Sequence, residues 1–174
     1  MRLGTAALLL AAAALPACES HRAEKMLAEA QRQGASGETA AAAETLRALM
    51  RDYPETRAAE SARDLLPTYE GLLGVASRNR TRDAEDLLRR TARAVELFKE
   101  AHHSLPLSLR VLVPESLETM PMDPWGHELK YEASEDRYAL TTFGADGAAG
   151  GEGENQDMRI EDGEFVSSPR WLEP

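Results

Sequence analysis

Residues 123–157 read DPWGHELKYEASEDRYALTTFGADGAAGGEGENQD, and this stretch decides the fold. An Asp-Pro pair starts a turn, a tryptophan supplies a large apolar anchor, and a glycine permits the chain to reverse. We therefore predict a tight structural turn formed by Asp123, Pro124, Trp125 and Gly126. The turn is followed by two runs of alternating apolar and polar residues and then by a long loop rich in glycine and acid.

The two alternating runs cover residues 128–133 and 137–143, and residues 134–136 join them. Alternation over five to seven residues predicts half-buried strands, so we expect a β-hairpin here. Further strands are expected at 158–161 and 164–167. Upstream, residues 82–103 carry apolar residues at steps of three and four, which predicts an amphipathic helix. The sequence thus predicts an α+β domain with a helix followed by short strands.

The charge of the chain is concentrated in this last third. The 174 residues hold 30 acids and 20 bases, for a net charge of −10, but residues 122–174 alone hold 13 acids and 4 bases. An acidic chain lacks the basic surface that phosphate binding needs, so nucleic acid is not an expected partner. A single cysteine excludes an intramolecular disulfide and a thiolate-rich zinc site.

The acidic glycine loop, residues 144–157, has the composition of a calcium site. Calcium takes six to eight oxygen ligands from carboxylates and backbone carbonyls, and glycine lets the backbone turn its carbonyls inward. Asp146 and Asp157 bracket the loop and can close it around an ion. Glu152 and Glu154 are further oxygen donors. The alternative is a solvated acidic loop without an ion.

The N-terminus, residues 1–17, reads MRLGTAALLLAAAALPA: one basic residue, an apolar run and small residues. This order predicts a secretory signal peptide, since the run is too short to span a bilayer well. Leu15-Pro16-Ala17-Cys18 resembles the bacterial lipobox. That resemblance implies cleavage before Cys18 and acylation of this residue, which gives stable anchoring in a membrane. In lipoproteins of bacteria with two membranes, Asp at the next position favours retention in the inner membrane, so Glu19 favours the periplasmic face of the outer membrane.

Residues 18–76 read as helices separated by a glycine-containing break and by Tyr53-Pro54. Thr56 is expected to cap a further helix over residues 57–66, and residues 77–81 are expected to form a polar joint. The order of an alanine-rich helix, a turn, a second helix and a closing proline resembles a tetratricopeptide repeat. This segment either binds a peptide or spaces the next domain from the membrane. We therefore divide the chain into 1–17, 18–76, 82–167 and a tail, 168–174.

Two motifs together make a more specific resemblance. Met120-Pro121-Met122-Asp123-Pro124-Trp125-Gly126, followed after one hairpin by Phe143-Gly144-Ala145-Asp146-Gly147, Gly150-Gly151-Glu152-Gly153 and Asp157, is similar to the major pseudopilin of the type II secretion system. In that family a long helix packs on a small antiparallel sheet and the acidic loop binds calcium, so the resemblance implies both features here. The resemblance implies Asp146 and Asp157 as side-chain ligands and the backbone carbonyls of Phe143 and Gly151 as further ligands.

The chain also departs from that family. The short basic leader and uninterrupted hydrophobic helix of pseudopilins are not present in the sequence, so the fibre-forming role is not expected here. His127 stands where the family usually has asparagine after DPWG.

Three classes of function remain open at this point. The first is a non-enzymatic lipoprotein that binds envelope or secretion-system proteins, and the second is a calcium-stabilised spacer without a specific partner. The third, a hydrolytic enzyme, is disfavoured: the four histidines have no zinc-ligand spacing, no serine lies in a nucleophile motif, and no small-molecule substrate is indicated.

Overall fold

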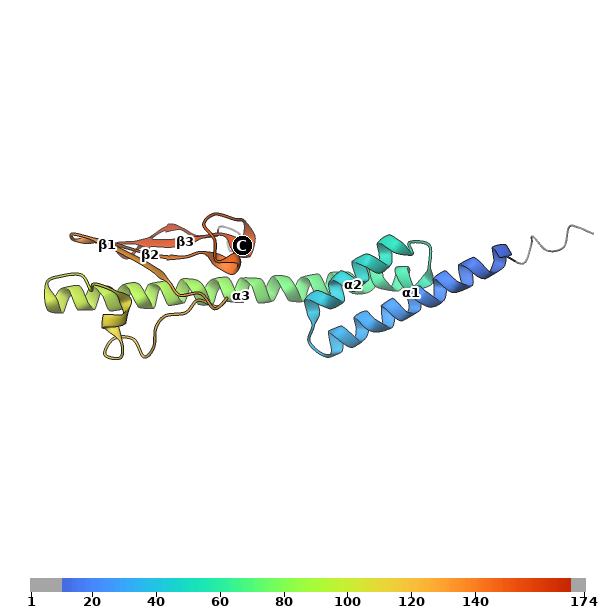
Figure 1. The fold of residues 1–174 in the computed structure, drawn as a ribbon, viewed down its shortest axis with the longest axis horizontal. Coiled ribbons are helices and arrows are strands. Elements are labelled where there is room, and N and C mark those ends of the chain that lie inside the picture. Colours follow the sequence, from blue (N-terminus) through green and yellow to red (C-terminus); the bar gives the residue numbers. More distant parts are fainter. Residues whose placement is uncertain (1–10, 170–174) are drawn as a thin grey trace, which may run out of the picture. The chain divides into compact units, whose positions relative to one another are not determined.

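A computed structural model describes residues 11–169, and its side chains are described from Cys18 onward. The fold is α+β, as predicted: three α-helices precede a four-stranded sheet (Figure 1). The chain divides into two compact units, the first ending at Val75 and the second beginning at Ala76. The elements are α1 (Ala11–Ala35), α2 (Thr39–Asp52), α3 (Arg57–His102), β1 (Lys130–Ser134), β2 (Arg137–Thr142), β3 (Met158–Glu161) and β4 (Glu164–Ser167), with short 3-10 helices η1 (Leu109–Leu112), η2 (Gly144–Asp146) and η3 (Gly153–Asn155).

The first unit is a helical hairpin that packs on the start of α3. Its core combines small and large side chains, since alanines let helix backbones approach while leucines fill the space between them. The fully or almost fully buried members are Ala23, Ala30, Leu46, Leu49, Ala58 and Ala62. A Cβ at Gly34 would collide with the ring of Tyr69, which would have to move aside for a larger residue to fit between α1 and α3.

Helix α3 begins as the sequence predicts but does not stop where we expected. The N–H of Ala59 donates to Thr56 Oγ1 (3.3 Å), which confirms Thr56 as the cap. We expected this helix to end at residue 66 and residues 77–81 to form a joint, and both expectations are wrong, because α3 continues to His102 with Pro67 inside it. The residues past Pro67 are mostly good helix formers, so the local cost of the proline and the glycines does not end the helix.

The second unit packs one face of the later part of α3 against the sheet. Its core takes Ala84, Leu88 and Val95 from α3, and Tyr138, Leu140, Met158 and Ile160 from β2 and β3. These positions follow the spacing expected of one face of a helix and one face of a strand. Figure 1 shows the sheet along one side of this part of α3 and the segment after His102 along another.

The sheet is an antiparallel meander in the order β1-β2-β3-β4. Tyr131 pairs with Leu140 across β1 and β2, and Leu140 pairs with Ile160 across β2 and β3. Strands β3 and β4 have the predicted bounds, whereas β1 begins two residues later than expected. Residue Glu128 instead forms an isolated bridge with Met122, which closes the DPWG turn.

Candidate functional site

The carboxylate of Asp123 is the centre of the DPWG turn. It is 4% exposed, and its Oδ1 accepts hydrogen bonds from the backbone N–H groups of Trp125 (3.1 Å) and His127 (2.8 Å). Its Oδ2 accepts a hydrogen bond from Thr142 Oγ1 at 2.5 Å. A buried carboxylate is stable only when its oxygens are bonded, and here both are. The turn is therefore joined to the end of β2.

The first residue of the acidic glycine loop is held by the same group of side chains. His127 Nδ1 lies 3.1 Å from the carbonyl oxygen of Gly144 and 3.6 Å from Asp123 Oδ2. The N–H of Gly144 is 3.4 Å from Thr142 Oγ1, which can accept a hydrogen bond from it. The imidazole also lies against Gly147, where an added Cβ would be 3.0 Å from Nε2. The turn thus sets where the loop begins.

Two glycines permit close backbone contacts within the loop. Gly144 has a φ of +67°, and a Cβ there would lie 2.7 Å from the carbonyl carbon of Asn155 and collide with the carbonyl oxygen of Glu154. Gly151 has a φ of +83°, and its Cβ would lie 2.5 Å from the carbonyl oxygen of Asn155. Both the backbone angle and the space exclude a side chain at these positions.

The predicted side-chain ligands lie in different surroundings. Asp157 Oδ2 accepts the N–H of Gly150 (3.0 Å), while its Oδ1 is buried and has no hydrogen-bond partner among the described residues. Asp146 Oδ1 accepts the N–H of Ala148 (3.1 Å) and is exposed. Glu154 is bound by Arg80 of α3, at 2.6 and 2.8 Å from two guanidinium nitrogens. Glu152 is exposed.

The acids of the loop do not form a compact cluster of side chains. Across the described part of the chain, no three His, Cys, Asp or Glu side chains come close enough to hold one metal ion together. Glu154 already forms an ion pair with the guanidinium of Arg80. A bound cation would accordingly take most of its oxygens from the backbone and few from carboxylates. The carbonyls predicted as ligands belong to Phe143, immediately before η2, and to Gly151, which lies against Asn155 within the loop.

The contacts of three residues that hold this site together were not predicted from the sequence. Thr142 holds Asp123, His127 holds Gly144, and Arg80 holds Glu154. A signal existed for Thr142, because it is a polar residue at an inward position of the alternating strand Tyr138, Leu140, Thr142. No local pattern identifies Arg80, which is 74 residues from its partner.

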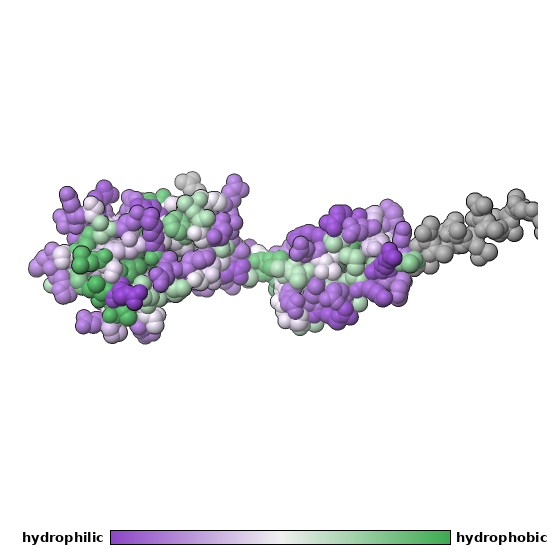
Figure 2. All heavy atoms as spheres, in the orientation of Figure 1, coloured by the Kyte–Doolittle hydropathy of each residue, from purple (hydrophilic) through white to green (hydrophobic). Residues whose placement is uncertain are grey.

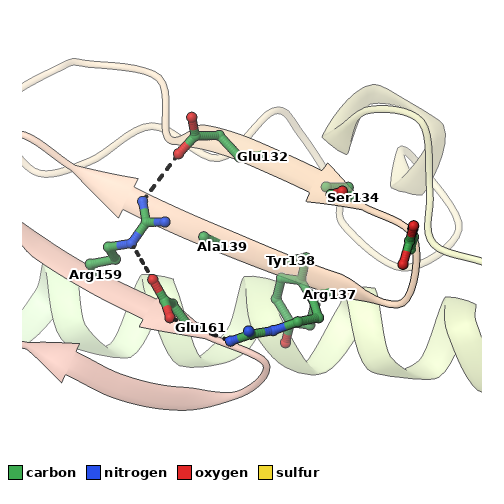
Figure 3. Close-up of a pocket in the computed structure, with 9 residues that line it drawn as sticks. Glu132, Ser134, Arg137, Tyr138, Ala139, Arg159 and Glu161 are labelled. Carbon is green, nitrogen blue, oxygen red and sulfur yellow. Dashed lines mark hydrogen bonds and ion pairs between the residues drawn. The ribbon is translucent and has the colours of Figure 1, made fainter.

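The outer face of the sheet has an open pocket of about 510 Å³, and a network of ion pairs crosses it. Arg159 of β3 lies between Glu132 of β1 (3.1 Å) and Glu161 (2.9 Å), as Figure 3 shows. Hydrogen bonds from Lys130 and Arg159 hold the pKa of Glu132 below its usual value, and Glu161 and Glu132 raise the pKa of Arg159. Glu132, Arg159 and Glu161 are thus paired with one another within the protein.

Tyr138 points from the other face of the sheet toward α3 (Figure 3). Burial raises the pKa of its phenol, and the hydroxyl lies 3.4 Å from the carbonyl oxygen of Ala92, to which it donates. This tyrosine joins sheet and helix within the core.

Cys18, the predicted acylation site, is exposed and lies in α1. Residues 1–10 of the predicted signal peptide and residues 170–174 of the predicted tail lie outside the described residues. None of the helices within residues 11–169 is both long enough and apolar enough to cross a membrane.

A long helix on a small antiparallel meander, with a tight Asp-Pro turn and a glycine-rich acidic loop, defines a pseudopilin-like head domain. The family described as type II secretion system (T2SS), protein G matches residues 72–161, more than half of the chain, and the chain belongs to this family. A search of curated proteins finds no match. The match covers α3 from Leu72, the DPWG turn, the hairpin, the loop and β3.

Membership of this family links the chain to type II secretion. Proteins of this family are structural components of a secretion system in the cell envelope, and their partners are other proteins of that system. The family therefore supports a structural role rather than a catalytic one.

Replacing Gly144 with alanine tests whether the loop ends are packed as described. We expect a loss of about 2–4 kcal/mol in the free energy of unfolding, because both the positive φ and the contact with Glu154 and Asn155 oppose a side chain. The measurement is urea unfolding followed by tryptophan fluorescence.

Gly153→Ala is the matched control. Gly153 has nearly the same φ, +63°, but no atom within 4 Å of the added Cβ. The free energy of unfolding of this variant should fall only by the cost of placing alanine at a positive φ, about 1–2 kcal/mol. Equal losses in the two variants would show that the loop ends are not in contact.

Proposed function

We propose that this chain is a cell-envelope lipoprotein whose pseudopilin-like head binds calcium and takes part in protein–protein interaction or assembly linked to type II secretion. The observation that carries the proposal is the family match over residues 72–161, which includes both the DPWG turn and the acidic glycine loop. In the structure these two motifs meet through Asp123, Thr142, His127 and Gly144.

Calcium is supported by the chemistry of the loop. Asp157 Oδ1 is a buried carboxylate oxygen without a partner among the described residues, and such an atom is costly unless a donor or a cation satisfies it. Five glycines of the loop have positive φ and can present carbonyls to an ion: Gly144, Gly147, Gly150, Gly151 and Gly153. Asp157, Asp146 and the carbonyls of Phe143 and Gly151 would hold the ion. Its charge would offset the repulsion among the acids of the loop.

The membrane anchor is proposed at Cys18. The residue follows an apolar run and small residues in the sequence, and it is exposed at the surface of α1. Several acyl chains on one residue give a lasting attachment, which a single chain does not. The resulting location is the periplasmic face of the outer membrane, with Glu19 as the reason for preferring that membrane.

A second candidate function is a spacer stabilised by calcium without a specific partner. It is supported by residues 70–80 of α3, none of which is buried. A segment of this kind adds length to a chain without adding a core.

We expect millimolar calcium to raise the melting temperature of the protein by about 3 °C or more and EDTA to lower it, because a ligand that binds only the folded state stabilises it. Asp146→Ala should abolish the difference. Asp136→Ala is the control, since it removes an exposed carboxylate from the hairpin turn outside the loop and should keep the calcium effect. A wild-type melting temperature that is insensitive to calcium would contradict the proposal.

Cross-linking in intact cells tests the role itself. After purification of the wild-type chain from membranes, we expect proteins of the secretion machinery to be cross-linked to it reproducibly. The Cys18→Ala variant, which should no longer take up labelled palmitate, should lose these products because it leaves the membrane. No reproducible product with the wild type would favour the spacer, and palmitate in the variant would refute the anchor.

A further inference from the structure

Strand β1 lies at one edge of the sheet. In the order β1-β2-β3-β4 it has β2 on one side, and no strand of residues 11–169 pairs with its other side. Figure 3 shows this strand, which carries Glu132 and Ser134, beside β2 alone. An uncovered edge presents backbone N–H and C=O groups with which another extended chain can pair.

The hydrogen bonds of the sheet show which residues of β1 point outward. Tyr138 stands opposite Ala133, yet its N–H donates to Asp162 Oδ1 (2.8 Å) and its C=O accepts from the N–H of Asp162 (3.1 Å), on the side of β3. Bonded and unbonded pairs alternate along antiparallel strands. Glu132 therefore bonds to β2, and the backbone groups of Tyr131 and Ala133 face away from β2.

The chain itself covers only the start of this edge. The N–H of Leu129 donates to the C=O of Pro121 (3.4 Å), so residue 129 bonds outward, in step with Tyr131 and Ala133. The pairing then ends, and no residue of 11–169 outside the sheet makes a backbone hydrogen bond to Tyr131 or Ala133. Two residues of β1 thus keep an open edge for a further strand.

Two cavities follow one another along this open edge. One, of about 270 Å³, is lined by Leu129 and Tyr131, and the other, of about 310 Å³, by Tyr131 and Ala133. The opposite wall of both belongs to residues 104–110, where Leu107 lines both cavities and is 96% exposed. Figure 2 shows apolar side chains gathering on the side of this unit where the segment after α3 lies. Side chains at alternate positions of an extended chain would enter successive cavities.

The charges at the cavities favour a basic partner. Glu128 and Glu135 line them, whereas Arg110 is the one base among their lining residues. Both acids are exposed, and neither forms an ion pair within the part of the chain that the structure describes. A Lys or Arg of the partner would complement this surplus of negative charge.

A second copy of β1 is a poor match for the open edge. If Tyr131 of one copy paired with Ala133 of the other, the two Glu132 side chains would stand opposite each other, which destabilises a sheet. If the two Tyr131 residues paired, Ala133 of one copy would take the place of Pro121 beside Leu129. If the two Ala133 residues paired, Tyr131 would face the hairpin turn of the copy. The edge therefore fits a segment of another protein better.

From the open edge, the cavities and their charge, we infer that β1 binds an extended segment of a partner protein as an additional strand. The backbone of the segment would bond to Tyr131 and Ala133, and its apolar side chains at alternate positions would enter the cavities. A Lys or Arg would face Glu128 or Glu135. The inference rests on the proposed function in one respect, because the partner is a protein.

The test begins with selection of short random peptides displayed on phage, with the full mature chain as the target. We expect the selected peptides to carry apolar residues at alternate positions and at least one base. Each backbone nitrogen of a selected peptide is then methylated in turn. Methylation should weaken binding roughly tenfold at every second residue and have little effect between them, since only alternate N–H groups of a strand face its neighbour.

A change in the protein gives a second, independent test. Ala133→Pro removes an outward N–H and leaves the bonds between β1 and β2 intact, as proline on an edge strand does when its nitrogen faces solvent. We expect peptide binding roughly tenfold weaker than in the wild type at a similar melting temperature. Ala133→Ser, which keeps the N–H at the same exposed position, is the matched control and should bind like the wild type.

The cavities are tested by Leu107→Ser, which should weaken peptide binding severalfold because it removes apolar contact at the rim. The melting temperature should not change, since Leu107 is almost fully exposed. Val166→Ser is its control: Val166 is 55% exposed on β4, at the other edge of the sheet, and lines neither cavity.

The inference is overturned if no peptide is enriched, if acidic peptides are selected, or if methylation has no two-residue period. The methylation result stands even where Ala133→Pro does not fold, because it leaves the protein unchanged. A wild type that sediments as a dimer, together with a monomeric Ala133→Pro, would give the edge to a second copy and also overturn the inference. Cross-linking to secretion proteins in cells does not depend on β1 alone, so its success alongside these failures would leave the proposed function standing.

Discussion

The buried carboxylate of Asp123 is the interaction on which the head domain depends. Its two oxygens accept hydrogen bonds from two backbone amides of its own turn and from the hydroxyl of Thr142. An acid of this kind is tolerated in a core only when its partners are in place, so turn and strand can form only together. An Asp-Pro turn and a hairpin that lacked these hydrogen bonds could each form without the other.

The hydrogen bonds around Asp123 also determine where the acidic glycine loop begins. His127 and Thr142, which both contact Asp123, also contact the backbone of Gly144, where the loop begins. From there, Gly144, which has a positive φ, lets the start of the loop touch Glu154 and Asn155 near its end, and Arg80 of α3 holds Glu154. The loop is thus fixed by three elements of the fold, although its own composition is that of a flexible segment. A cation at Asp157 would add to a geometry that the surrounding residues already favour.

Strand bounds and helix caps are predicted well from the sequence, whereas contacts between residues far apart in the chain are predicted poorly. Bounds of β3 and β4 follow from alternation and turn residues, and the cap at Thr56 follows from residue type. The continuity of α3 was missed because Pro67 and a polar segment read as breaks, whereas a helix with enough good helix formers passes through both. In the site, the acids of the loop were found by composition. The contacts of Thr142 and Arg80 were not, because each joins residues far apart in the chain.

The central claim is that the link between Asp123 and Thr142 prepares the loop for a cation. Calorimetric titration of calcium into the wild type and into Thr142→Val tests it most directly, because valine keeps the shape of threonine and removes only the hydroxyl. We predict one calcium site in the wild type and an affinity roughly tenfold lower in the variant, which leaves Asp123 Oδ2 unbonded. Equal affinities, or no calcium binding by the wild type, would contradict the account.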